Sequence, residues 1–190
     1  MILTQENEYA AVLDSSVLVP MPLCDTLLRL AEEPAMYRPL WSDQILQEVG
    51  RVLEIAFGYS AEQSKRRINA MCQAFPEASK TIPACLPGSF DGIPDENDRH
   101  VLAAALRGEA NAIVTHNVKH FPTDYLAQFD MLVQPPDDFL IHQFHLNPQQ
   151  VLEKLDAQAS GIRKSRPDVI RLLRPMVSNF VGLIEKWTSV

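Results

Sequence analysis

The stretch from residue 94 to residue 121 limits the possible folds of this chain most strongly, because it combines a helix, a strand and a polar loop. Acidic residues, among them Asp95 and Asp98, precede a segment whose apolar side chains recur on one helical face. Gly108 should end that helix in the left-handed conformation that glycine adopts at least cost. The apolar residues 112–115 then predict a buried strand. A helix that opens with acids and leads into a buried strand is half of an α/β site.

A second apolar strand, residues 9–13, ends at Asp14, and the strand at 112–115 leads into Asn117. Ligands of open α/β sheets bind beyond the carboxyl ends of the strands. We predict that these two strands are neighbours in one parallel sheet. Asp14, Asp98 and Asn117 would then converge.

Strands alternate with helices in the first part of the chain, which predicts an α/β fold with a mostly parallel central sheet flanked by helices. Further strands are expected at residues 37–41, 80–82 and 131–133. Pro39 should confine the first of these to an edge of the sheet or make it short. Helices are expected over residues 22–30, 42–56 and 60–75.

From residue 137 on, the pattern is helical only, so we predict two parts, a domain of residues 1–136 and a helical C-terminal extension of residues 137–190. The last helix carries a long apolar stripe and should be kinked at Pro175. Because such a stripe must be covered, we expect the extension to pack on the domain, on a second protomer or on another protein.

The chain is acidic, with a formal net charge of −7. Proteins that hold nucleic acid without sequence preference are usually basic. Any nucleic-acid contact must therefore use local patches, such as residues 65–67, Lys119 with His120, and the basic residues between Arg163 and Arg174. An ordinary solvated helix face is the alternative reading of each patch.

The sequence gives no sign of a membrane segment, because no apolar run approaches the roughly 20 residues that cross a bilayer. The first residues also lack the pattern of a secretory signal. Cys24, Cys72 and Cys85 have no metal-binding spacing, which predicts free thiols in a reducing compartment. We therefore expect a cytoplasmic protein.

The polar residues that could form a site offer mainly oxygen ligands: Asp14, Glu48, Asp98 and Asn117. Hard divalent cations such as Mg²⁺ prefer such ligands. The chain has no Cys–His cluster for zinc, no nucleophile elbow and no glycine-rich phosphate loop after a strand. Carboxylates around Mg²⁺ or Mn²⁺ suit the hydrolysis of phosphodiester bonds.

Each of these residues also has a structural explanation, and spacing alone leaves both open. Asp14 could cap the first helix, and Asn117 could be a turn residue. Asp95 and Asp98 could form a capping box. Glu48 could point to water or pair with a nearby arginine.

Three segments resemble the PIN-domain family of metal-dependent ribonucleases. VLDSSVLV resembles the family's first strand and first aspartate. SDQILQEVGRVL contains the expected glutamate. DRHVLAAALRGEANAIVTHNVKHFP resembles its acidic helix, the next strand and the following loop. The resemblance covers roughly residues 9–135 and implies a three-layer fold with a parallel sheet between helices.

The resemblance implies specific roles for residues of this chain. Asp14, Glu48 and Asp98 would bind Mg²⁺ or Mn²⁺, with Asn117 as a fourth catalytic residue. Secondary pocket candidates are Ser15, Asp95 and Thr115. Candidates for contacts with the RNA backbone are Arg99, Lys119 and His120.

Two positions depart from the family pattern. Ser15 and Ser16 stand where Thr-Asn usually follows the first aspartate, so we expect the support of that asparagine to be missing. Asn117 replaces a fourth acid, which favours one tightly held ion over two. We expect Asp14→Asn to abolish cleavage and to leave stability unchanged or improved, because it relieves repulsion between carboxylates.

Many small members of the family are VapC-like toxins of toxin–antitoxin pairs. The resemblance therefore implies an RNA substrate, a cognate antitoxin and a homodimer. Two alternatives remain open: a degenerate, non-catalytic PIN fold that acts as a binding module, and another α/β metal-dependent phosphohydrolase. Among such phosphohydrolases, a haloacid-dehalogenase-like enzyme is less favoured, because it would need an aspartate where Ser16 stands.

Overall fold

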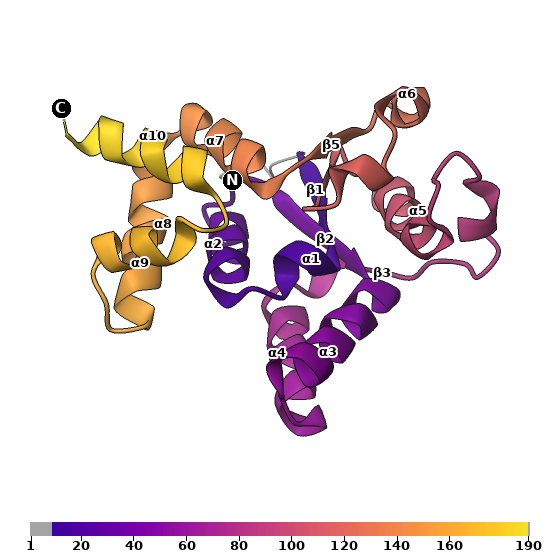
Figure 1. Cartoon of the computed structure of the whole chain (residues 1–190), viewed down its shortest axis with the longest axis horizontal. Helices are drawn as coiled ribbons and strands as arrows, with labels where there is room; N and C mark the ends of the chain where they lie inside the picture. Colours follow the sequence, from indigo (N-terminus) through magenta and orange to yellow (C-terminus); the bar gives the residue numbers. More distant parts are fainter. Residues whose placement is uncertain (1–8, 190) are drawn as a thin grey trace, which may run out of the picture.

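The computed structural model describes residues 9–189, which form a five-stranded parallel sheet with helices around it (Figure 1). The strands are β1 (Ala10–Leu13), β2 (Arg38–Ser42), β3 (Ser79–Lys80), β4 (Ala112–Val114) and β5 (Leu132–Gln134). Their order in the sheet is β3-β2-β1-β4-β5, and every pair is parallel. This confirms the predicted α/β fold.

Ten α-helices surround the sheet in the described part of the chain. They are α1 (Ser15–Leu18), α2 (Met21–Ala31), α3 (Asp43–Phe57), α4 (Ala61–Ala74), α5 (Arg99–Arg107), α6 (Thr123–Leu126), α7 (Pro136–Leu146), α8 (Pro148–Gly161), α9 (Arg166–Leu173) and α10 (Ser178–Thr188). In Figure 1, α3 and α4 form a hairpin below the sheet, α5 and α6 lie on one side, and the C-terminal helices lie on the other. The predicted caps are present, because Ser42 accepts a hydrogen bond from the Ile45 N–H and Ser60 one from the Gln63 N–H.

The strand β1 lies at the centre of the sheet and is completely buried. It pairs with β2 on one side and with β4 on the other, where Leu13 is opposite Val114. The predicted adjacency of these two strands is therefore confirmed. The chain adds strands first to one side of β1 and later to the other. The carboxyl ends of β1 and β4 thus form the topological switch point where open α/β sheets bind ligands.

Gly108 ends α5 as predicted, but the left-handed conformation expected for it is wrong, and so is the edge position expected for the strand of Pro39. Gly108 follows α5 with φ −92°, and Glu109 takes the left-handed conformation with φ 53°. Glycine is needed there for space, because a Cβ on it would lie 2.7 Å from Leu40 Cδ1. Pro39 is in β2, which is an interior strand. It is tolerated because β3 pairs only with Trp41 and Ser42, so β2 has no partner strand on that side at Pro39.

The C-terminal helices cover α2 and one another. The apolar stripe of the last helices is buried at Val169, Leu173, Phe180 and Ile184. Pro175 separates α9 from α10 where a kink in one helix was expected. Of the three expected places for the extension, the described chain shows packing on its own α2.

Specific contacts join the extension to the rest of the chain. The ring of Tyr37, next to β2, meets Phe139 of α7 edge-on at 4.9 Å. The buried Thr26 hydroxyl of α2 donates to Gln158 Oε1 of α8 at 2.8 Å, and Gln158 Nε2 donates to the carbonyl of Pro22 at 3.0 Å. We keep the division into residues 1–136 and 137–190 as a proposal, with the two parts sharing one core.

No helix within residues 9–189 is long and apolar enough to span a membrane. The three cysteines are free thiols, as expected.

We predict that Gln158→Leu lowers the free energy of unfolding of the whole chain by about 1–3 kcal/mol, because two buried hydrogen bonds are lost. Gln149→Leu is the matched control on the exposed side of α8, where Gln149 bonds only Glu153, and it should change stability by less than about 0.5 kcal/mol. Urea unfolding measures both. Two separate transitions, of which Gln158→Leu shifts one, would show that the extension folds independently.

Candidate active site and metal centre

Asp14 follows β1 directly and its carboxylate is held from several sides. It is 4% exposed and caps α1. Its Oδ1 accepts from the Ser15 N–H at 2.7 Å, and its Oδ2 accepts from the hydroxyls of Ser16 and Thr115, both at 2.7 Å. We expected Asp14 to lack the support of the asparagine that usually follows it in the family. The Ser16 hydroxyl supports the Asp14 carboxylate instead. The structural role of Asp14 as a cap is present together with its place at the switch point.

The loop after β4 is tied to the same network. The Ser16 hydroxyl accepts from the His116 N–H at 3.1 Å, and the Thr115 hydroxyl accepts from the Asn117 N–H at 3.0 Å. Asn117 is exposed, and its backbone N–H, rather than its side chain, enters this network. The loop is thereby held against the end of β1.

Asp98 approaches this region from a different part of the chain. It ends a 3₁₀ turn, Glu96–Asp98, immediately before α5. The predicted capping box is not formed, because Asp95 Oδ1 accepts from the N–H and the side-chain amide of Asn97, both at 2.9 Å. The carboxylate of Asp98 is free of a capping role and instead accepts from His120 Nδ1 at 2.6 Å.

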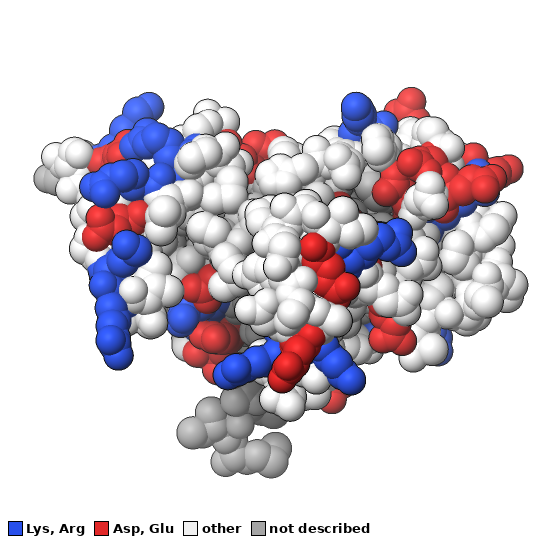
Figure 2. All heavy atoms as spheres, turned by 60° about the horizontal axis from the view of Figure 1, so that its bottom comes forward, with Lys and Arg blue, Asp and Glu red and all other residues white. Residues whose placement is uncertain are grey.

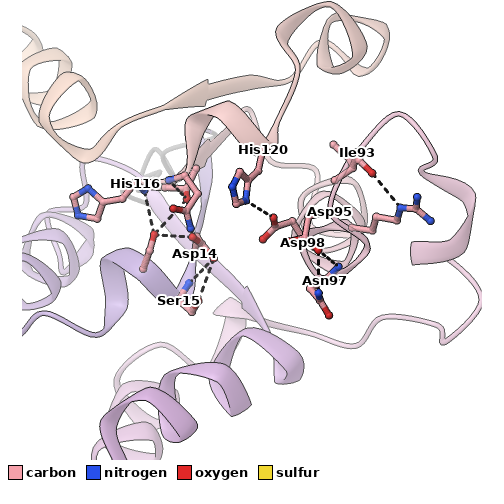
Figure 3. Close-up of polar contacts among 12 residues, drawn as sticks. Asp14, Ser15, Ile93, Asp95, Asn97, Asp98, His116 and His120 are labelled. Atoms are coloured by element: carbon pink, nitrogen blue, oxygen red, sulfur yellow. Dashed lines mark hydrogen bonds and ion pairs between the residues drawn. The ribbon is translucent and has the colours of Figure 1, made fainter. Parts of the chain in front are cut away.

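Asp95, Asp98 and His120 form a compact group. Their ligand atoms all lie within 4.8 Å of one another, and within residues 9–189 no other group of three or more His, Cys, Asp or Glu side chains is as compact. In Figure 3, Asp98 lies between the Asp14 region and Asp95, with the His120 ring beside it. Asp14 and Glu48 are not members of this group.

The pKa of Asp98 is raised above its ordinary value, mainly because the carboxyl is partly buried. The hydrogen bond and charge of His120 oppose this shift, and the negative charges of Asp95 and Asp14 add to it. Asp14 and Asp98 are thus close enough for their charges to interact. The pKa of Asp95 is lowered, chiefly by the hydrogen bond from the Asn97 backbone.

Glu48 reaches the start of α5 through a histidine that the sequence analysis missed. Its Oε1 lies 2.8 Å from Nε2 of His100, which is 1% exposed. Nδ1 of His100 is buried without a hydrogen-bond partner. The sequence offered one signal for this contact, because His100 stands two residues after Asp98. The helix pattern alone does not say which residue of α3 the His100 ring contacts.

The three candidates for RNA contacts have different surroundings. Arg99 Nε donates to the carbonyl of Ile93 at 3.2 Å, and its guanidinium lies 3.6 Å from Glu96, so it is engaged within its own loop. Lys119 is exposed. His120 is bonded to Asp98, which makes it part of the acid cluster.

This ligand set fits a divalent cation. Burial, and to a smaller extent the negative charges of Asp95 and Asp14, raise the pKa of Asp98, and a cation at this place would offset the repulsion between the carboxylates. Asp95, Asp98 and His120 could hold such an ion, with Asp14 facing it across the site. A set with one imidazole and several carboxylates suits Mn²⁺ better than Mg²⁺, which favours oxygen ligands.

Comparison with known proteins places the chain in a family. A model described as "PIN domain" matches residues 10–119, more than half of the chain. The chain belongs to the PIN domain family. The matched segment runs from β1 through the loop after β4, so it includes Asp14, Glu48, Asp98 and Asn117.

A shorter match links this PIN domain to a named relative. Over 49 residues, this chain is 55% identical to the protein named "Putative ribonuclease VapC50" of Mycobacterium tuberculosis (strain ATCC 25618 / H37Rv). The match covers 26% of this chain and 29% of that relative's length. No solved structure matches the chain.

We predict that Asp98→Asn stabilises the metal-free protein at pH 7. Because the folded state raises the pKa of Asp98, it binds more protons than the unfolded state between the ordinary value near 4 and the raised value, so stability falls as pH rises through that window. The side-chain amide of the Asp98→Asn variant does not ionise, so the variant does not lose this stability. Thermal unfolding in chelator should show a higher Tm for the variant at pH 7, with the gain vanishing below about pH 4.

Asp14→Asn should have the opposite effect, which revises the expectation from sequence. An amide in place of Oδ2 would turn donors toward the Ser16 and Thr115 hydroxyls, which already accept backbone N–H groups. We expect a loss of about 1–3 kcal/mol in chelator. Equal stabilisation by the two substitutions would contradict this account of the site.

Proposed function

We propose that this PIN-domain protein is a metal-dependent endoribonuclease that hydrolyses phosphodiester bonds of RNA with Mg²⁺ or Mn²⁺. The observation that carries the proposal is the meeting of acids from distant segments at the switch point: Asp14 after β1, and Asp98 with Asp95 before α5. The family match and the name of the VapC50 relative support a ribonuclease.

Each residue has a distinct part in the proposed reaction. Asp98, Asp95 and His120 would hold the ion, and Asp14 would add its charge from the opposite wall. A divalent cation at such a site activates water and offsets charge on the phosphate. Glu48, fixed by His100, and Asn117 at the loop would orient water or phosphate. Thr115 and Ser15 hold Asp14 in place.

The surface charges indicate where the RNA backbone would lie. Figure 2 shows Lys and Arg side chains gathered at the end formed by the C-terminal helices. Most of that patch is neutralised, because Arg166 pairs with Asp156, Arg171 with Asp168, and Arg174 with Glu185. Lys119 instead lines a hollow of about 570 Å³ with Asp95 and His120. We therefore place the backbone contact at Lys119.

We further propose that the protein is the toxin of a type II toxin–antitoxin pair and acts in the cytoplasm as a homodimer. This part rests on the resemblance to VapC-like proteins. Support from the fold comes from the exposed apolar side chains of α3, where Ile55 is 79% exposed and Phe57 is 59% exposed. Such side chains favour a protein partner at the α3–α4 hairpin.

We predict that Mn²⁺ raises the Tm of the wild-type protein and permits RNA cleavage, and that chelator abolishes both effects. A ligand that binds only the folded state stabilises it, by about 2.7 kcal/mol at a hundredfold excess over Kd. Asp98→Asn should lose the Mn²⁺-induced shift and the cleavage together. Glu62→Gln, on the far helix α4, is the matched control and should keep both. Cleavage that persists in Asp98→Asn would contradict the proposed centre.

His100 gives a second test through Glu48. His100→Leu removes the contact with Glu48 Oε1, and loss of such a supporting partner typically weakens metal binding by about 10–100-fold. His100→Gln keeps a donor and should retain most of the affinity for Mn²⁺, measured by calorimetry. If the leucine variant binds Mn²⁺ as the wild type does, Glu48 does not support binding of the ion, and its part is limited to orienting water or phosphate.

A further inference from the structure

A polar cavity of about 350 Å³ lies beside the acid cluster, at the carboxyl ends of β2 and β3. Its walls include Gln44, Gln47, Glu48 and Arg51 of α3 together with Ile82 and Asn97. The cavity is at the small end of the range for ligand sites, which suits a group the size of one nucleotide.

The helix α3 presents its polar residues to this cavity in one row. Gln44, Gln47, Glu48 and Arg51 stand at positions i, i+3, i+4 and i+7 and so share one face of the helix. Gln44, Gln47 and Arg51 are exposed, and in the part of the chain that the structure describes their side chains make no hydrogen bond or ion pair. Their donors and acceptors are available to a ligand.

Two residues join the cavity to the acid cluster. Glu48, on one wall, bonds His100 two residues after Asp98. Asn97, on another wall, donates to Asp95 and also lines the hollow that contains Lys119 and His120. A ligand in the cavity would therefore lie directly beside a phosphate held at Asp98.

The lining favours a nucleobase over a phosphate. Asp43 and Glu48 contribute two carboxylates against the one guanidinium of Arg51, which disfavours an anion. The amides of Gln44 and Gln47 offer both donors and acceptors, as the edge of a base requires. Arg51 offers a planar group for stacking and Ile82 an apolar contact. Single-stranded RNA is read by such hydrogen bonds and stacking.

We propose that this cavity binds one base of the RNA next to the cleaved phosphate and gives the enzyme its sequence preference. The RNA substrate rests on the proposed function. Gln47 and Arg51 read the base, and Asn97 holds the boundary between the base and the phosphate.

The test uses binding without cleavage. A random RNA pool is captured on the full-length protein in chelator, and the retained RNA is sequenced. The wild type should enrich one base at one position, and Gln47→Ala and Arg51→Ala should each reduce that enrichment by about 2–10-fold. Gln73→Ala and Asn69→Ala are the controls, because both are exposed polar residues of α4 that do not line the cavity, and they should change nothing.

A second arm maps cut ends in Mn²⁺, where the enriched base should flank the cut. The proposal is overturned if no base is enriched, if both α3 variants keep the enrichment, if the α4 variants lose it equally, or if cuts fall away from the base. Enrichment that depends on α3, without any cleavage in Mn²⁺, would preserve the base site and refute the proposed nuclease activity.

Discussion

The parallel pairing of β1 with β4 is the constraint on which the rest of the structure depends. It places Asp14 beside Thr115, so that the two hydroxyls of Ser16 and Thr115 can fix one carboxylate. Because strands are added to both sides of β1, the carboxyl ends of β1 and β4 form the switch point at which open α/β sheets bind ligands. The position of the site is therefore a property of the topology, and the residues there only determine its chemistry.

The acids at this switch point differ in what they contribute to the fold. Asp14 is surrounded by donors and stabilises the turn in its charged form. Asp98 is partly buried and lies near the negative charges of Asp95 and Asp14, and both effects raise its pKa and oppose its ionisation. One acid thus builds the site and the other is held there at a cost to stability. Such a cost is expected where a cation is to be bound.

The sequence was sufficient for features that depend on local pattern. Buried strands, the caps at Ser42 and Ser60, and the acidic start before α5 all follow from residue type and spacing. The pairing of Glu48 with His100, and of Asp98 with His120, could not be predicted in this way. Those contacts depend on how α3, α5 and the loop after β4 are placed relative to one another, which only the packed sheet determines. Gly108 was misjudged for the same reason, since its role is clearance for Leu40.

The position of α8 along the chain has a consequence for synthesis of the protein. Every residue of the acid site precedes β5, whereas the helix that covers α2 begins only at Pro148. Domains fold from the N-terminus while the ribosome is still translating. A nascent chain would therefore complete its acid site while the apolar side of α2 is still bare. Emergence of α8, rather than formation of the sheet, would then mark the moment when this surface is closed.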